Sequence, residues 1–194
     1  MGFELLTRDA LGFVDAVAEY LTPLLAARRF TCTDSSTYHV RYASSRVTLD
    51  VWHENLSYEI DVRFALSANP SSKISLIDLL RPELGEDSER SGSFQASTRD
   101  AIEHSIQRIA GLISTYGQRV LSGEETEFAR VMSFARAANA THTETVVHAP
   151  IREAATMAWQ RRDFAAVKRL YESMEGDLDE LEARKLDYAR KQVG

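Results

Sequence analysis

The first part of the chain carries a helical pattern of apolar side chains. Between residues 9 and 27 these side chains recur at steps of three or four, which places them on one face of a helix. The residues of this face are Ala10, Val14, Val17, Ala18, Leu21, Leu24 and Leu25. Pro23 lacks a backbone donor, so we expect it to kink the helix or to start its last turn.

From residue 30 onward, apolar and polar side chains alternate, which is typical of strands with one buried face. The predicted strands are residues 30–34, 38–42, 47–51 and 58–66, joined by turns at Ser44-Ser45 and Glu54-Asn55. The pattern therefore predicts a four-stranded antiparallel meander. We expect the N-terminal helix to cover the apolar face of this sheet.

The remainder of the chain reads as helical. Ser75 and Asp78 form a capping-box pattern that predicts a short helix, and Pro82 is expected to end it. Residues 82–96 are polar and acidic, which predicts a mobile loop. The sequence thus predicts an α+β protein with a helix-and-sheet domain over residues 1–81 and a region of helical hairpins, packed on or beside the sheet, over residues 97–194.

Composition narrows the function classes. The 194 residues are 44% hydrophobic and 27% charged, with a net charge of −6 and a single cysteine. One cysteine excludes an internal disulfide, and the acidic balance disfavours nucleic acid, which binds clustered lysine and arginine. A protein partner with a basic surface suits this charge better. No secretion signal or membrane-length apolar run is evident, so we expect no membrane association and a cytoplasmic protein.

Cys32, His39 and Asp50 are residue types that can act as nucleophile, base and orienting carboxylate. Two-residue turns would place Asp50 opposite both His39 and Glu59. The register that buries Phe30 also buries Cys32, so we expect a structural cysteine. We predict no catalytic residue.

His142, Glu144 and His148 are the histidine cluster with metal-like spacing. Neither HExxH nor a cysteine pair accompanies them, and a polar linker is the favoured interpretation. Glycine-rich phosphate loops are also missing from the sequence. We therefore predict neither a metal nor a cofactor.

Trp52 stands out on the polar side of the meander, because it alternates with the apolar residues of its own strand. One interpretation is that it packs beneath a later helix; the other is that it anchors a protein partner within a charged rim. On the second interpretation, the candidate partner-binding residues are Asp50, Trp52, His53, Glu54, Glu59 and Asp61.

Three segments carry a resemblance to a known class of proteins. They are VRYASSRVTLDVWHENLSYEIDVRF, SLIDLL and AWQRRDFAAVKRLYESMEGDLDELEARKLDYARK. They resemble small bacterial cytosolic proteins of the toxin-immunity type. The resemblance implies a non-catalytic module of immunity or adaptor type that docks on or occludes a partner. Two alternatives remain open: a small-ligand-binding or hydrolytic enzyme, and a helical oligomerisation subunit of a larger assembly. Self-association is also left open.

Overall fold

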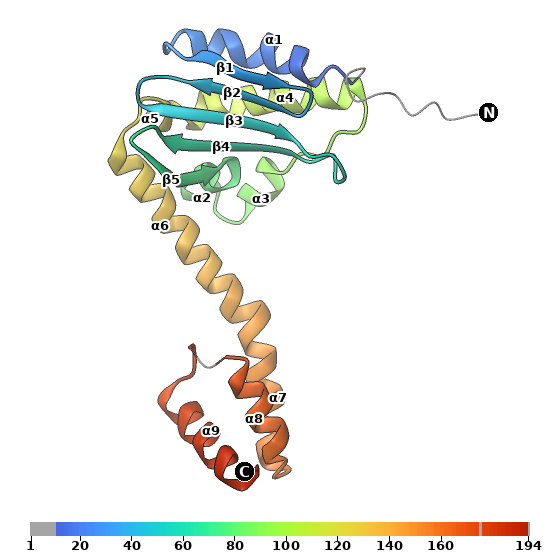
Figure 1. The fold of residues 1–194 in the computed structure, drawn as a ribbon, viewed down its shortest axis with the longest axis vertical. Helices are drawn as coiled ribbons and strands as arrows, with labels where there is room; N and C mark the ends of the chain where they lie inside the picture. The colour runs from blue at the N-terminus through green and yellow to red at the C-terminus, as the bar shows by residue number, and fades with distance from the viewer. Residues whose placement is uncertain (1–10, 175, 194) are drawn as a thin grey trace, which may run out of the picture. The chain divides into compact units, whose positions relative to one another are not determined.

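The computed structural model describes residues 11–174 and 176–193, and Figure 1 shows its elements. Two units divide the chain, Met1–Ala135 (unit 1) and Arg136–Gly194 (unit 2). The predicted helix start at Asp9 and Ala10 lies outside the described residues. No helix among the described residues is both long enough and apolar enough to cross a membrane.

Unit 1 contains helix α1 and an antiparallel sheet with strand order β1-β2-β3-β4-β5. These elements are α1 Phe13–Ala26, β1 Thr31–Ser36, β2 His39–Ala43, β3 Val47–His53, β4 Ile60–Leu66 and β5 Asn69–Ser75. The helices that follow are α2 Leu76–Leu84, α3 Asp87–Gly92, α4 Arg99–Tyr116, α5 Gln118–Leu121 and α6 Glu125–His142, and the division between the units falls within α6. The predicted α+β class, with its antiparallel sheet and helical second half, is confirmed.

The predicted number of four strands is wrong, because the structure has five. Strand β5 pairs with β4 through Arg63 opposite Ser75 and Phe64 opposite Ile74. Within β5, Ser72 and Ile74 are the buried residues. A single large apolar side chain in a segment that also contains proline gives no visible alternation, so the local pattern does not indicate a strand.

The register of the meander also differs from the prediction. Asp50 lies opposite Arg41 on β2 and Arg63 on β4, rather than opposite His39 and Glu59. Both differences are even numbers of residues along the strands. Since side chains alternate with a period of two, each residue still lies on the predicted face.

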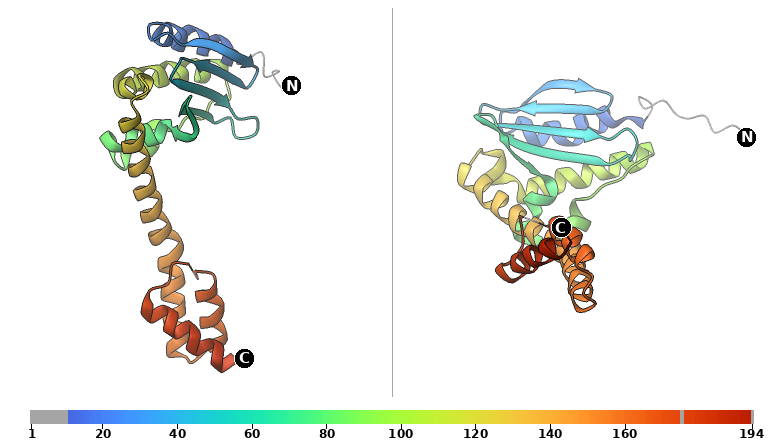
Figure 2. Two further views of the ribbon diagram at one scale, coloured as in Figure 1. Left: turned by 60° about the vertical axis from the view of Figure 1, so that its left-hand side comes forward. Right: turned by 60° about the horizontal axis from the view of Figure 1, so that its bottom comes forward.

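The core of unit 1 lies between the sheet and its helices. Helices α1 and α4 lie side by side on one side of the sheet (Figures 1 and 2). The buried strand residues facing them are Val40, Tyr42, Val47, Leu49, Val51, Ile60, Val62 and Phe64. The hydroxyls of Thr22 on α1 and Tyr42 on β2 are 2.8 Å apart, which links helix to sheet. The predicted packing of the first helix on the apolar face is confirmed.

Two details of residues 75–96 can be compared with the prediction. The capping box is present, since Ser75 Oγ accepts from Asp78 N at 3.1 Å and Asp78 Oδ2 accepts from Ser75 N at 3.0 Å. Pro82, however, lies within α2 and does not end it. The segment predicted as a mobile loop holds the end of α2 and the short helix α3.

The predicted polar linker before Pro150 is helical instead. Helix α6 passes into a π-helix, η2, at Thr143–His148, and then into α7 at Ala149–Gln160. The segment Thr143–His148 contains neither glycine nor proline, the residues that break helices, and it follows directly on the helical residues of α6. Polarity alone therefore gave the wrong element here.

Unit 2 also contains α8, Phe164–Glu172, and α9, Glu180–Val193. The Asp163 carboxylate accepts from Ala166 N at 3.0 Å and so caps the start of α8. A small core forms among these helices, and its buried residues are Ala155, Ala158, Val167, Tyr171, Leu186 and Ala189.

Candidate functional site

The side of the sheet turned away from α1 and α4 carries the polar residues of β2, β3 and β4. None of the described helices of unit 1 lies over this side (Figures 1 and 2). We call its outward side chains the open face: His39, Arg41, Thr48, Asp50, Trp52, Asp61 and Arg63.

Trp52 points outward on the open face and is partly buried. Its cross-strand neighbour is His39, whose ring stacks on the indole with centroids 3.8 Å apart and planes inclined by 17°. On its other side, Trp52 pairs with Asp61 of β4. The indole is therefore fixed in place by the sheet and lies within a charged surround.

Asp50 is the centre of a polar network next to this stack. Its Oδ1 lies 2.6 Å from His39 Nε2 and accepts from Arg41 Nε at 2.7 Å, while Oδ2 accepts from Arg41 Nη2 at 3.2 Å. On the far side of the imidazole, Asp34 Oδ2 lies 3.4 Å from His39 Nδ1. Burial acts to raise the pKa of Asp50, but the hydrogen bonds from Arg41 and His39 outweigh it and hold this pKa below its ordinary value.

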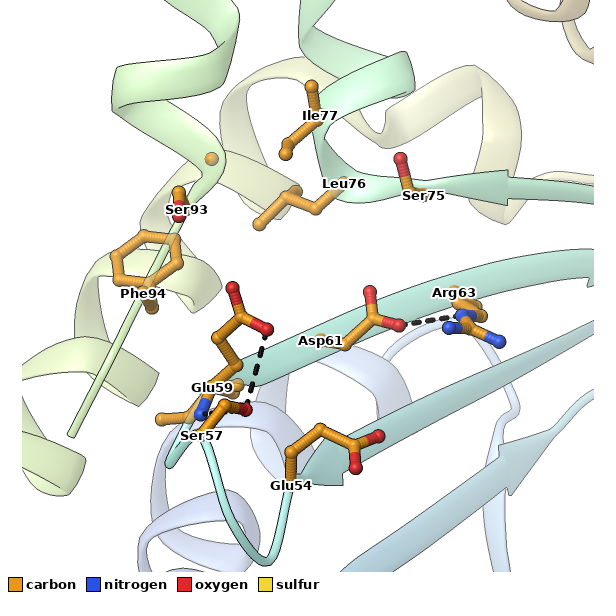
Figure 3. A pocket seen from close by; sticks show the side chains of 12 residues that line it. Glu54, Ser57, Glu59, Asp61, Arg63, Ser75, Leu76, Ile77, Ser93 and Phe94 are labelled. Carbon is orange, nitrogen blue, oxygen red and sulfur yellow. Dashed lines mark hydrogen bonds and ion pairs between the residues drawn. The ribbon is translucent and has the colours of Figure 1, made fainter. Parts of the chain in front are cut away.

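An acidic cleft of about 350 Å³ adjoins the open face at the start of β4 (Figure 3). Glu54, Glu59 and Asp61 contribute its carboxylates. Arg63 donates to Asp61 at 2.6 Å, and the Ser57 hydroxyl donates to Glu59 at 3.4 Å. Ile60, Leu76 and Phe94 are among the apolar residues that line the cleft. The cleft carries more negative than positive charge, which suits a basic side chain.

The loop between β3 and β4 forms one rim of the acidic cleft. Leu56, in this loop, is 92% exposed. Tyr58, two residues later, has φ 57, a left-handed conformation that bulky residues rarely adopt. An exposed leucine and a strained tyrosine thus lie in a loop that also supplies Glu54 and Ser57 to the cleft.

The six predicted partner-binding residues are divided among the open face, the acidic cleft and the core. Asp50 and Trp52 belong to the open face, Glu54 and Glu59 line the acidic cleft, and Asp61 belongs to both. His53 belongs to neither, because its side chain is 1% exposed and lies in the core.

The position of His53 follows from the alternation of β3, which turns it toward α1 beside Val51. Its ring centroid lies 5.4 Å from that of Phe13, and its Nε2 lies 2.9 Å from the Ala96 carbonyl oxygen. The His53 side chain therefore packs in the core of unit 1 and offers no surface to a partner.

Cys32 pairs with Tyr42 and so lies on the helix side of the sheet, opposite to the open face. The prediction that it is buried is wrong, since Cys32 is exposed while Phe30 is buried. The strand β1 is at the edge of the sheet, and all six of its residues are exposed. Cys32 and the His39–Asp50 pair therefore lie on opposite faces and cannot act together.

The histidine cluster of unit 2 forms an ion-pair network. His148 lies 3.5 Å from Glu144 and 3.6 Å from Asp177, and Arg152 donates to Glu144 and to Glu182. Among the described residues, no group of histidine, cysteine and carboxylate side chains has the arrangement of a metal site. His142 ends α6 and takes no part in the network.

Several residues of the site were not among the predicted ones. His39 belongs to the site because it stacks on Trp52, and Arg41 and Arg63 belong to it because they lie opposite Asp50 on the neighbouring strands. The alternation of the sequence already places these three residues on the polar face. Leu56 carries a sequence signal of its own, as an apolar residue inside a polar turn. Phe94 reaches the cleft from a segment distant in sequence, and no local pattern indicates this.

No protein family, curated protein or solved structure matches this chain. The resemblance to immunity proteins therefore remains a prediction.

Proposed function

We propose that the protein is a non-catalytic protein-binding module of immunity or adaptor type, which docks on or occludes a protein partner with a basic surface. The observation that carries this proposal is the open face, where a tryptophan stacked on His39 lies on the side of the sheet that α1 and α4 leave uncovered. Tryptophan anchors inside polar rims are the residues that dominate protein–protein binding energies.

Charge supports the choice of a basic partner. The open face and the acidic cleft together hold the carboxylates of Asp50, Glu54, Glu59 and Asp61, against the guanidinium groups of Arg41 and Arg63. Asp50 is already paired with the Arg41 guanidinium, so the excess negative charge lies at the cleft. Such rim charges raise association rates, while a fixed anchor such as Trp52 slows dissociation.

Site-specific photo-crosslinking in the native host tests this proposal. A benzophenone side chain is placed at Thr48 on the open face, and at exposed Gln107 on α4 as the matched control. We expect a discrete adduct from the Thr48 position, with a partner whose contact surface is rich in lysine and arginine. Adducts from the Gln107 position alone, or equally from both positions, would contradict the proposal.

A second candidate function, self-association through unit 2, has its own support. Six of the large apolar residues that are exposed lie in this unit, and they are Val146, Val147, Met157, Leu181, Tyr188 and Val193. The core cluster of the unit has no more than six buried residues. Sedimentation velocity across a concentration series should then show an oligomer that Leu181→Glu dissociates. A wild-type monomer at every concentration excludes this candidate.

A further inference from the structure

A second hollow, of about 420 Å³, lies at the other end of the sheet from the β3–β4 loop. It is formed where the end of α1, the β2–β3 turn and α5 come together, and Figure 1 shows α5 at that end of the sheet. Three arginines line it, Arg28, Arg29 and Arg46, and no carboxylate among the described residues does. A hollow whose charged lining residues are all arginines is unexpected in a chain whose net charge is −6.

The three guanidinium groups are not used in ion pairs with any side chain that the structure describes. Arg28 is held by the Leu24 carbonyl oxygen, to which it donates at 3.0 Å, and by Gln118. Arg46 also borders a neighbouring hollow that contains Glu124 and Glu125. The Glu124 carboxylate already accepts from Arg119 Nε at 2.8 Å and from Ser122 Oγ at 3.1 Å.

Two residues have a left-handed backbone conformation, one in the lining of this hollow and one in the lining of the neighbouring hollow. Arg29 has φ 61, a left-handed conformation that costs a bulky residue free energy and is concentrated at ligand sites. Gly123 has φ +74, and a Cβ at this position would lie 2.7 Å from Arg46 Cβ. Because Gly123 has no side chain, Arg46 can pack against the backbone at this position. This contact fixes the position of Arg46 Cβ.

Hydroxyl groups add neutral donors to the lining. Ser44 Oγ is occupied, since it accepts from Arg46 N at 3.3 Å and from Val47 N at 3.1 Å. Ser45 also lines the hollow and makes no side-chain hydrogen bond with the described part of the chain. Arginine forks and a serine hydroxyl are the donors that bind phosphate oxygens.

We propose that this hollow binds the phosphate group of a small phosphate ester. Arg29 and Arg46 would donate to the phosphate oxygens, with Arg28 and Ser45 beside them. The volume falls in the range of small-molecule sites, roughly 300–1,000 Å³, so the hollow has room for more than inorganic phosphate. Leu121 and Ala27 are the apolar walls, and in the described part of the chain no aromatic ring lines the hollow for a base to stack on. Recognition therefore centres on the phosphate. This site is separate from the open face.

Titration of the full chain with glycerol phosphate tests the assignment, with chloride keeping the ionic strength constant. Backbone NMR shifts should saturate and be confined to the α1 end, the β2–β3 turn and α5. Arg29→Gly relieves the left-handed strain and should fold at least as well as wild type, yet it should bind about tenfold more weakly, as should Arg46→Gln. The matched control is Arg90→Gln, because the Arg90 side chain is 86% exposed and lies outside the hollow.

Vesicles of phosphatidylcholine with and without phosphatidic acid form the second arm. Binding of phosphatidic acid vesicles alone would assign the phosphate to a lipid headgroup and support the same chemistry. Four results would overturn the proposal: shifts that never saturate, unchanged affinity in both Arg29→Gly and Arg46→Gln, an equal loss in Arg90→Gln, or tighter binding of oligothymidylate than of either phosphate ester.

Discussion

Replacing Asp50 by asparagine tests whether the polar network stabilises the open face. The carboxylate accepts from Arg41 and lies 2.6 Å from His39 Nε2, and its own side chain is 14% exposed. Hydrogen bonds to charged groups contribute about 1.5–3 kcal/mol each when they are buried. Arg41 is 46% exposed, so its pair is worth at most about 1 kcal/mol, whereas the His39 side chain is 7% exposed and would lose a buried partner. We expect Asp50→Asn to cost about 2 kcal/mol.

The sign of the pH dependence follows from the pKa of Asp50, which is held below its ordinary value of 3.8 in the folded protein. The stabilisation is present above that value and is lost as the pH falls through the lower, folded pKa. The free energy of unfolding measured with urea should therefore be about 2 kcal/mol higher for wild type than for Asp50→Asn at about pH 7, and this difference should shrink at about pH 3.

Asp61→Asn is the matched control for this experiment. The carboxylate of Asp61 pairs with Arg63 in an exposed position, so the substitution should change stability by less than about 0.5 kcal/mol. Equal stability of wild type and Asp50→Asn at about pH 7 would refute the reasoning, and so would a difference that stays constant down to about pH 3.

Two further predictions concern the backbone and the thiol. Gly123→Ala should destabilise the protein by about 1–3 kcal/mol, because φ is +74 and the new Cβ would lie 2.7 Å from Arg46 Cβ. Gly111 lies on α4 with open space around it, so Gly111→Ala should stabilise the protein by about 0.5–1 kcal/mol. Thermal melts measure both changes. The two substitutions should change stability in opposite directions, and a Gly123→Ala variant as stable as wild type would contradict this reasoning. Cys32 is exposed, so it should react with a thiol reagent at the rate of a free cysteine without unfolding, whereas slow labelling would mean that β1 is covered.

The alternation of apolar and polar residues predicted the face on which each strand residue lies. This assignment depends only on whether the residue's position in the strand is odd or even. Val51 and Trp52 lie on opposite sides whichever residue pairs with Asp50, so the register differences left the open face intact. The same alternation places His53 in the core beside Val51, away from the open face.

Burial depends on neighbours that the local sequence does not contain. Cys32 lies on the helix side of the sheet as predicted, yet it is exposed because β1 is at the edge of the sheet. The acidic cleft similarly depends on Phe94 lying beside Ile60. Ile60 N donates to the Phe94 carbonyl oxygen at 2.9 Å, which holds the two segments together. Such long-range contacts have no signature in periodicity, so the candidate site could be predicted only in part.

The central claim is that the open face binds a protein partner with Trp52 as its anchor. The most direct test is the dissociation rate of the complex with the crosslinked partner, measured with purified proteins for wild type, Trp52→Ala and Trp159→Ala. The control removes the other tryptophan, which packs against Phe164 and Tyr188 in unit 2. Loss of an anchor costs about 2 kcal/mol, so Trp52→Ala should dissociate about thirtyfold faster while Trp159→Ala dissociates like wild type. A folded Trp52→Ala variant that dissociates at the wild-type rate would contradict the account.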